Sequence, residues 1–349
     1  MRACLRYARR HEGLTRTNPS VGTLIVRDGV IVGRGVTARG GRPHAEPIAL
    51  AEAGEAARGA TAYVTLEPCA HHGVTPPCAE ALIAAGVARV VTAYVDPDRR
   101  VDGRGHAMLR DAGVAVAEGR EGARAAQDLA GYLTRKTHDR PHVTLKLAVS
   151  TDGYLGRVGE EVAITGPGAK AQVHAMRARA DAILIGSGTA KSDDPGLTCR
   201  LTGLLDRSPH RFVLGALDPH AQLARTARKT PTTLVSALPL TWELAAAGVG
   251  HLQAETYEGA LALPEMLEDM AALGHASVLV EGGARVASSF LGGGLVDRLV
   301  LFASPQPLGG HGGRPIASPV TPDAVPQGFE LVDRRTFGDD AALLFERRR

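Results

Sequence analysis

The first part of the chain alternates short apolar runs with segments rich in Ala and Glu. Residues 21–36 hold two β-rich runs around Asp28-Gly29. This predicts a hairpin, because glycine tolerates the positive φ of a tight turn. The other expected strands are 61–66, 88–95 and 114–117, and the expected helices are 45–57, 78–86, 104–112 and 121–135. Strands that alternate with helices predict a central sheet covered by helices.

A second alternating series follows the polar segment KTHDRP at 136–141. Its expected strands are 142–149, 181–188, 211–217, 232–238, 277–283 and 298–304, and its expected helices are 167–179, 262–273 and 284–292. The full length of 349 residues exceeds the size at which one core usually keeps growing. The pattern therefore predicts two α/β domains, at 1–140 and 141–349.

Composition narrows the classes of protein. The formal charge of +3 and the 4% of aromatic residues argue against a general nucleic-acid binder. No apolar run approaches the roughly 18 residues of a membrane span, and the N-terminus has no apolar core of signal-peptide length. Four cysteines are too few for a disulfide framework, and Cys4 and Cys199 have no evident role. We expect a cytoplasmic homo-oligomer with a small phosphorylated ligand and no nucleic-acid or membrane partner.

Two short motifs carry metal chemistry. His44 and Glu46 precede an expected helix, and Cys69 and Cys78 bound a loop in PCAHHGVTPPC. Zinc prefers N and S donors, and a catalytic site keeps one position for water. Helix N-termini favour the thiolate form that binds a metal. Hydrolysis of a C–NH2 group also needs a proton carrier, and a carboxylate two residues from the histidine can serve.

The order H-x-E…P-C…C is the zinc-deaminase signature, which has C-x-x-C, although eight residues separate the cysteines here. Taken singly, Cys69 and Cys78 could be thiols of the core and His44 a helix-capping residue, with no part in metal binding. Together, with Pro43, Pro68 and Pro77 each preceding a ligand, they favour a metal site. His71 and His72 lie between the cysteines and either compete as ligands, contact substrate or shape the loop.

The motifs HAE and TLEPCAHHGVTPPC, with NPSVGTLIV at 18–26, resemble the bifunctional riboflavin-biosynthesis deaminase/reductase family of the RibD type. The resemblance covers nearly the whole chain. It implies a cytidine-deaminase-like α/β/α fold for the first domain. The implied reaction removes the 2-amino group of 2,5-diamino-6-(5-phosphoribosylamino)-4(3H)-pyrimidinone as ammonia. The implied roles are zinc ligands for His44, Cys69 and Cys78, proton shuttle for Glu46, and substrate contact for Asn18.

The stretches at 143–153, 164–200 and 278–291 resemble the second domain of that family. This implies a dihydrofolate-reductase-like α/β fold that uses NADPH to reduce the ribosyl group to ribityl. Residues are carried over position by position. The implied substrate contacts are Arg177, Arg200 and Glu281, and the implied NADPH contacts are Ala148, Thr189, Asp193 and Gly283.

The residues of the second domain, taken alone, leave alternatives open. GSGTAKSDDP lacks the third glycine of the Rossmann fingerprint. The turn at Gly282-Gly283 either lets backbone amides approach a pyrophosphate or only joins a strand to a helix. Arg177 and Arg200 either grip a phosphate or are solvated surface charges. Lys146, in an apolar strand, either faces a pocket or is an edge or snorkelling lysine.

The chain departs from the family at several positions. Val74 stands where a basic residue is usual between the cysteines, and this is expected to weaken substrate binding. In the second domain Ala163 replaces a typical Trp, Glu161 a usual Ser, and Gly215-Ala216 an Asp-Ser pair. Hydride transfer needs little from side chains beyond positioning, so the reductase is expected to tolerate these changes.

The sequence is compatible with three functions. The leading one is the bifunctional enzyme, and the second keeps the deaminase but makes the C-terminal domain a degenerate scaffold. The third is a deaminase of a tRNA or DNA base, which the lack of a clustered basic patch and the few aromatics disfavour. A purely structural zinc module would be expected to offer four protein ligands.

Overall fold

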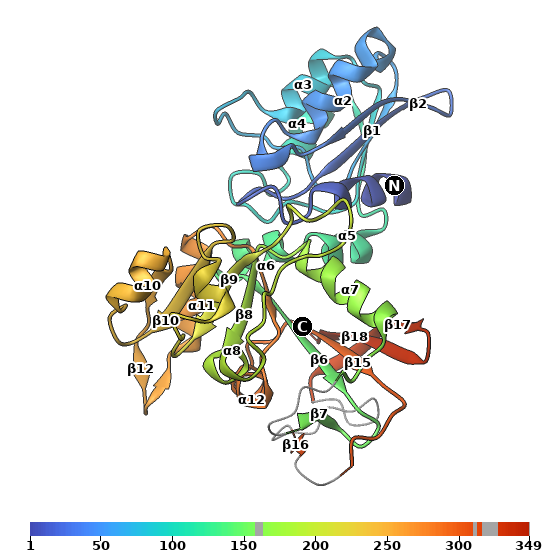
Figure 1. The fold of residues 1–349 in the computed structure, drawn as a ribbon. Coiled ribbons are helices and arrows are strands. Elements are labelled where there is room, and N and C mark those ends of the chain that lie inside the picture. Colours follow the sequence, from blue (N-terminus) through green and yellow to red (C-terminus); the bar gives the residue numbers. More distant parts are fainter. Residues whose placement is uncertain (158–162, 310–312, 316–326, 349) are drawn as a thin grey trace. The chain divides into compact units, whose positions relative to one another are not determined.

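The computed structural model describes residues 1–157, 163–309, 313–315 and 327–348. The chain forms two compact units, Met1–Asp139 and Arg140–Arg349. Each unit is an α/β structure with its own sheet and its own core (Figure 1). Among the described residues, no helix combines the length and apolar character needed to cross a bilayer.

The first unit is built on a five-stranded sheet of order β2-β1-β3-β4-β5. Its strands are β1 (Gly22–Arg27), β2 (Val30–Val36), β3 (Thr61–Val64), β4 (Arg89–Thr92) and β5 (Ala115–Ala117). β1 pairs antiparallel with β2 and β3, whereas β3, β4 and β5 run parallel. The hairpin around Asp28-Gly29 is confirmed, with positive φ at both residues.

Six α-helices accompany this sheet: α1 (Arg2–Ala8), α2 (Ala45–Ala53), α3 (Cys78–Ala84), α4 (Arg104–Asp111), α5 (Gly122–Asp128) and α6 (Ala130–His138). Strand residues such as Ile25 and Val90 form one buried core with Ala49, Leu82 and Leu109 from the helices. The single helix expected at 121–135 is two helices, separated at Leu129.

Two glycines of β2 bring α2 close to the sheet. A Cβ on Gly33 would meet the carbonyl oxygen of Ala49, and a Cβ on Gly35 would meet that of Ala45. Side chains at these positions would push the helix away. The small residues therefore hold the start of α2, where His44 and Glu46 lie, directly against the sheet.

The second unit contains a nine-stranded sheet of order β11-β10-β9-β8-β14-β6-β15-β18-β17. Its strands are β6 (His142–Val149), β8 (Ala182–Gly186), β9 (His210–Leu214), β10 (Thr232–Ser236), β11 (Gly250–Gln253), β14 (Ser277–Val280), β15 (Arg298–Ala303), β17 (Phe329–Phe337) and β18 (Asp340–Arg347). The strands from β11 to β15 run parallel. The terminal hairpin β17–β18 adds antiparallel to β15.

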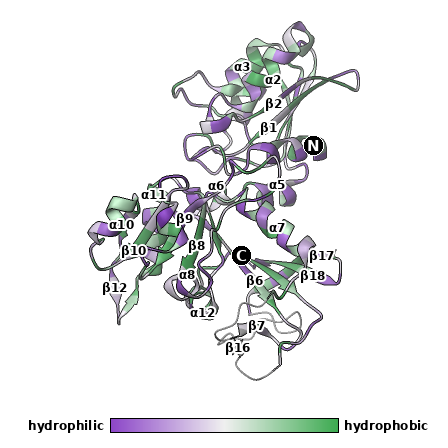
Figure 2. Cartoon of the chain, viewed as in Figure 1, coloured by the Kyte–Doolittle hydropathy of each residue, from purple (hydrophilic) through white to green (hydrophobic). Residues whose placement is uncertain are grey.

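Helices cover both faces of this sheet. They are α7 (Pro167–Arg177), α8 (Ser187–Asp193), α9 (Gln222–Arg225), α10 (Trp242–Ala247), α11 (Leu263–Ala272) and α12 (Ala284–Gly292). Because side chains alternate along a strand, Leu184 of β8 packs in the core with α11 and α12, whereas Ile183 and Ile185 pack with α9 and α10. In Figure 2 the central strand β8 is hydrophobic along its length.

Two-stranded pairs complete the unit: β7 (Tyr154–Arg157) with β16 (Gly313–Pro315), and β12 (Thr256–Tyr257) with β13 (Ala260–Leu261). The strand expected at 181–188 is too long, because β8 ends at Gly186 and Ser187 begins α8. Thr189 and Asp193 therefore lie on a short helix at the carboxyl end of a parallel strand, which is where open α/β sheets bind ligands.

Candidate active sites

The structure brings together the three expected metal ligands of the first unit. His44 caps the N-terminus of α2, Cys69 lies in the loop after β3, and Cys78 is the first residue of α3. Their donor atoms lie within 4.8 Å of one another. The Nδ1 atom of His44 is 3.7 Å from Sγ of Cys69 and 3.4 Å from Sγ of Cys78. One nitrogen and two sulfurs converging on one point form a donor set that suits zinc.

The local fold favours the anionic form of the Cys69 sulfur. Hydrogen bonds from the Cys78 thiol and from His44, together with the Cys78 backbone N–H at 3.2 Å, lower the pKa of Cys69 to about 4. The hydrogen bond to Cys69 and burial raise the pKa of Cys78. A bound metal ion needs both sulfurs deprotonated, and their place at the start of α3 assists this.

Glu46 lies in the first turn of α2 and is 4% exposed. Burial is the largest cause that raises its pKa to about 7, and the charge of Cys69 adds to the effect. A carboxyl group that exchanges a proton near neutral pH is suited to general acid–base chemistry. Glu46 is not one of the three donors that lie within 4.8 Å of one another, and its carboxyl group interacts with the Cys78 thiol.

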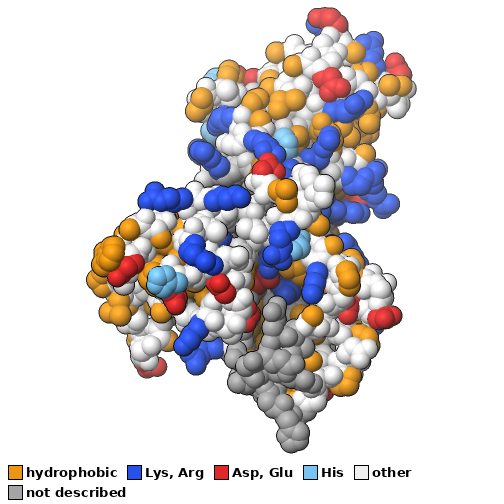
Figure 3. Space-filling model, viewed as in Figure 1, with side chains coloured by type: hydrophobic (Ala, Val, Ile, Leu, Met, Phe, Trp, Pro, Cys, Tyr) orange, Lys and Arg blue, Asp and Glu red, His pale blue; other side chains and the backbone are white. Residues whose placement is uncertain are grey.

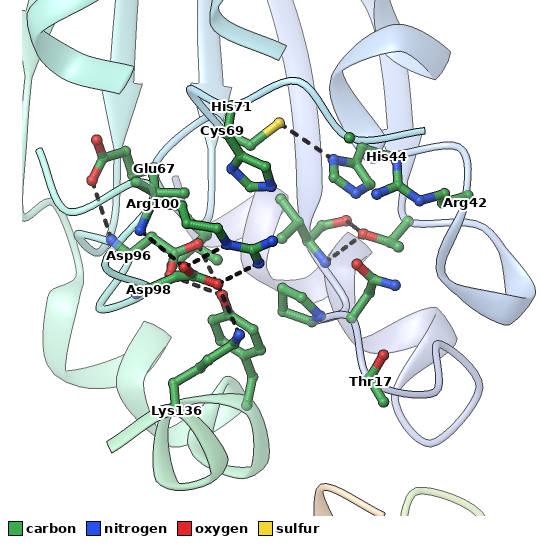
Figure 4. A pocket seen from close by; sticks show the side chains of 18 of the residues that line it. Thr17, Arg42, His44, Glu67, Cys69, His71, Asp96, Asp98, Arg100 and Lys136 are labelled. Atoms are coloured by element: carbon green, nitrogen blue, oxygen red, sulfur yellow. Dashed lines mark hydrogen bonds and ion pairs between the residues drawn. The ribbon is translucent and has the colours of Figure 1, made fainter. Parts of the chain in front are cut away.

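A pocket of about 400 Å³ is lined by His44, Cys69 and Glu46. Figure 4 shows His44 and Arg42 on one side of this pocket and Asp96, Asp98 and Lys136 on the other. Asn18 lines it as well. The amide of Asn18 lies where a side chain at position 41 would point, and Gly41, with φ of +92°, leaves that space open.

The opposite wall is a polar network that the sequence interpretation missed. The Tyr132 hydroxyl donates to Asp96 at 2.9 Å, and Arg100 and Lys136 contact Asp98 at 2.7 and 2.8 Å. Arg100 and Lys136 hold the pKa of Asp98 well below its usual range, whereas burial raises that of Asp96 to about 6. The signal was the segment DPDRR at the carboxyl end of a parallel strand.

Glu67 connects this wall to the metal site. It lies two residues before Cys69 and is buried. Its carboxylate accepts backbone N–H groups from Asp96, Gly103 and Gly105 at 3.3, 3.0 and 2.9 Å. The loop of residues 96–105 is thus held to the loop that carries a metal ligand.

The two histidines between the cysteines differ. His72 is exposed and lies 3.3 Å from Glu80, so it does not join the donor cluster. His71 lines the pocket, and its Nδ1 atom is buried with no hydrogen-bond partner among the described residues. A buried polar atom without a partner is uncommon in a folded protein, and the place of His71 in the pocket lining makes this residue a candidate for a ligand contact.

In the second unit a buried ionic cluster lies beyond the carboxyl end of β14. The guanidinium of Arg177 donates two hydrogen bonds to the carboxylate of Glu281, from Nε to Oε1 at 2.7 Å and from Nη2 to Oε2 at 3.0 Å. The Nζ atom of Lys146 lies 3.9 Å from Oε2 of the same carboxylate. Burial alone would raise the pKa of Glu281, but the charges of Arg177 and Lys146 more than offset it and lower the value. Burial also lowers the pKa of Lys146.

The structure excludes one of the two interpretations that the sequence left open for Lys146, and one of the two for Arg177. Lys146 lies on β6, between β14 and β15, so its interpretation as an edge lysine is wrong. Arg177 is paired with Glu281 and is not a solvated surface charge. Arg200 is exposed, and its backbone N–H donates to His174 Nδ1 at 3.3 Å, which places it near the same helix α7.

The expected cofactor contacts lie at the carboxyl ends of neighbouring strands. The backbone N–H of Gly283, at the N-cap of α12, donates to the Thr189 hydroxyl of α8 at 3.1 Å. Asp193 ends α8, and Ala148 lies near the end of β6. The Thr189 hydroxyl and the start of α12 together offer donors for an anionic cofactor, which fits NADPH.

The comparisons with known proteins cover both units. Residues 1–94 match the cytidine and deoxycytidylate deaminase zinc-binding region, and residues 141–343 match the RibD C-terminal domain. The riboflavin biosynthesis protein RibD of Escherichia coli strain K12 is 40% identical over 88% of each chain, and that of Aquifex aeolicus is 37% identical over 88% of this chain and 87% of its own. This chain belongs to the RibD family.

Solved structures of RibD proteins have folds similar to that of this chain over nearly its whole length. Acinetobacter baumannii RibD, form 1, is 35% identical with a TM-score of 0.87, over 100% of this chain and 98% of its own. A deaminase/reductase from Thermotoga maritima is 29% identical with a TM-score of 0.86, over 99% of this chain and 97% of its own. The expected pairing of a deaminase-like fold with a RibD reductase-like fold is confirmed.

The departures from the usual RibD pattern lie in different surroundings. Val74 is 85% exposed in the loop between the cysteines. Gly215 follows β9 with φ of +96°, beside Ser187 of α8, and Ala216 and Ala163 are exposed. Glu161 lies outside the described residues.

Proposed function

We propose that this RibD-family chain is a bifunctional enzyme of riboflavin biosynthesis. Residues 1–140 would deaminate the diaminopyrimidinone ribonucleotide, and residues 141–349 would reduce its ribosyl group to ribityl with NADPH. The observation that carries the proposal is the convergence of His44, Cys69 and Cys78 within 4.8 Å beside the buried Glu46. The family match over both units supplies the pairing of the two activities.

His44, Cys69 and Cys78 would hold a Zn²⁺ ion in the first unit. Such an ion supplies Lewis acidity that brings the pKa of a water molecule to about 7. Hydrolytic deamination adds one water to the ring carbon and releases ammonia, so a C–NH2 bond is exchanged for C=O. Three protein ligands leave the fourth position that a catalytic site requires.

Glu46 handles the protons of this exchange. Its carboxylate would take one proton from the attacking water and pass it to the ring nitrogen. It would then take the second proton, from the hydroxyl group now on the ring carbon, and pass it to the departing amine, which leaves as ammonia. Asn18 would bind the substrate through its amide, and His71, which lines the same pocket, suits a second contact. The buried position of Glu46 keeps bulk water from taking over the proton transfer.

In the second unit Thr189, Asp193, Gly283 and Ala148 would bind NADPH, and this cofactor would supply the hydride for the reduction. Arg177, Arg200 and Glu281 bind and orient the substrate. The bidentate Arg177–Glu281 pair fixes both side chains, and Lys146 adds a buried donor beside them. Positioning of this kind is the main protein contribution to hydride transfer.

The alternative of a degenerate reductase scaffold is not favoured. The match to the RibD C-terminal domain spans residues 141–343, and the ionic cluster around Glu281 is complete despite the substitutions at Gly215 and Ala163. Titration with NADPH, followed by its fluorescence, tests this directly. Saturable binding supports the reductase, and a linear response would support a scaffold.

The decisive assay offers zinc-loaded protein the diaminopyrimidinone ribonucleotide with and without NADPH. We expect ammonia release in both cases and NADPH consumption in the second. Absence of ammonia release would contradict the deaminase. Ammonia without NADPH consumption would contradict the reductase alone.

The expected setting is a cytoplasmic homo-oligomer without nucleic-acid or membrane partners. All four cysteines are free, which suits a reducing compartment. On the face shown in Figure 3 the Lys and Arg side chains are scattered and do not gather into one basic patch. Light scattering coupled to size exclusion would give the oligomeric state.

A further inference from the structure

Four Arg and Lys side chains line the pocket of the first unit, and they differ in the groups to which they are hydrogen-bonded. They are Arg42, Arg100, Arg135 and Lys136. Arg100 and Lys136 both contact the carboxylate of Asp98, and Arg135 adjoins Lys136 on α6. These three therefore belong to the wall that already carries Asp96 and Asp98.

Arg42 lies on the His44 side of the pocket, two residues before this ligand (Figure 4). Its Nη1 atom donates to the Thr75 hydroxyl at 3.1 Å, in the loop between the two cysteines. Among the described residues, no carboxylate lies within ion-pair distance of Arg42. Its positive charge is therefore not neutralised within the pocket.

The loop leaves room for this guanidinium. A Cβ on Gly73 would lie 3.4 Å from Nη2 of Arg42, so the guanidinium lies directly beside this loop. Val74 follows and brings no charge of its own. Arg42 keeps donors beyond the one used by Thr75, in the planar geometry that matches a phosphate.

We propose that Arg42, held by Thr75, is the residue that binds the phosphate of the substrate in the deaminase pocket and makes this site select phosphorylated pyrimidines. The inference rests on the proposed deaminase function. Arg42 has a binding role in this proposal and no part in the proton transfer assigned to Glu46. A dianionic phosphate gains most from a cation that has no carboxylate partner, which favours Arg42 over Arg100 and Lys136.

The test compares the diaminopyrimidinone ribonucleotide with the same compound after removal of its phosphate. For Arg42→Met we expect KM for the phosphorylated substrate to rise roughly 10- to 100-fold with little change in kcat. KM for the dephosphorylated substrate should stay unchanged. Arg99→Met, an exposed arginine that does not line the pocket, is the matched control. Zinc content and melting temperature should match the wild type.

Two further variants probe the geometry. Thr75→Val removes the hydrogen bond to the guanidinium and should raise the same KM by a smaller factor. Val74→Arg placed in the Arg42→Met background returns a cation to the loop and should restore preference for the phosphorylated substrate. Equal losses on both substrates for Arg42→Met would overturn the proposal. So would loss of the preference in Arg100→Met or Arg135→Met while Arg42→Met retains it.

Binding of ribose 5-phosphate to the zinc-loaded protein, measured by the chemical shifts of arginine side chains, separates this inference from the function it rests on. If the wild type released no ammonia but bound ribose 5-phosphate through Arg42, the deaminase assignment would fail and the phosphate site would stand. If ammonia were released but ribose 5-phosphate left the Arg42 resonance unmoved, the phosphate site would fail alone.

Discussion

At the residue scale, the proposed chemistry of the first unit depends on a buried carboxyl group beside three side chains that suit a metal ion. Glu46 is 4% exposed, and the helix that carries it packs tightly against β2. His44 and Glu46 lie at the start of α2, whereas Cys69 and Cys78 come from the loop after β3 and the start of α3. The expected ligands and the expected proton carrier are therefore different side chains that can be substituted separately.

Glu46→Gln should lower kcat for ammonia release by about 10²- to 10⁴-fold, because the amide occupies the same space but cannot exchange the proton. Zinc content should stay at the wild-type level, since Glu46 is not a member of the donor cluster. Kinetics with elemental analysis on the same preparation measure both. Retention of activity would show that another group moves the proton.

At the element scale, the approach of α2 to β2 positions the site. Gly35→Ala would place a methyl group against the carbonyl of Ala45, at the start of the helix that carries Glu46. Overpacking of this kind destabilises by about 1–3 kcal/mol, so the melting temperature should fall. Val30→Ala, at a 63% exposed position on the same strand, is the control and should change it little. Equal melting temperatures for the two variants would contradict tight packing here.

A histidine pair makes the second unit sensitive to acid. The rings of His210 and His275 lie 5.1 Å apart beside Phe212, and burial lowers the pKa of each to about 4. In the unfolded chain these rings take up protons near pH 6.5. The unfolded state thus binds more protons between pH 6.5 and 4, so the free energy of unfolding falls as the pH drops through this window.

His275→Gln should flatten that decline, because one titrating ring is removed. Denaturant unfolding at several pH values measures it, with His138→Gln, an exposed histidine on α6, as the control. A slope between pH 6.5 and 4 that is identical in the wild type and His275→Gln would show that the pair does not carry the acid sensitivity.

At the scale of the whole molecule, the two activities are assigned to two units with separate cores. Removal of zinc by a chelator should abolish ammonia release. NADPH oxidation with 5-amino-6-(5-phosphoribosylamino)uracil should continue, because the Arg177–Glu281 cluster contains no metal ligand. Ammonia release should return when zinc is added back. Parallel loss of both activities would contradict this independence.

The sequence was sufficient to predict that His44, Cys69 and Cys78 come together, because a motif with rare residue types at set positions reflects direct chemical need. It also predicted most strands, since long apolar runs report burial. It was not sufficient for the pocket wall. Asp96, Asp98 and Tyr132 are common residue types, and their role depends on contacts across 36 positions of chain.

Pairings that join distant segments were decided only by the tertiary structure. The sequence did not decide whether Lys146 lies at the edge of the sheet or faces a pocket. In the structure its strand β6 lies between β14 and β15, and its amine is close to Glu281. Arg42 is oriented by its hydrogen bond to Thr75. Arg177 pairs with the carboxylate of Glu281, which lies 104 positions further along the chain. Composition, periodicity and motif spacing are local properties of the chain. Charge compensation inside a pocket is set by which side chains meet, and that is known only when the chain has folded.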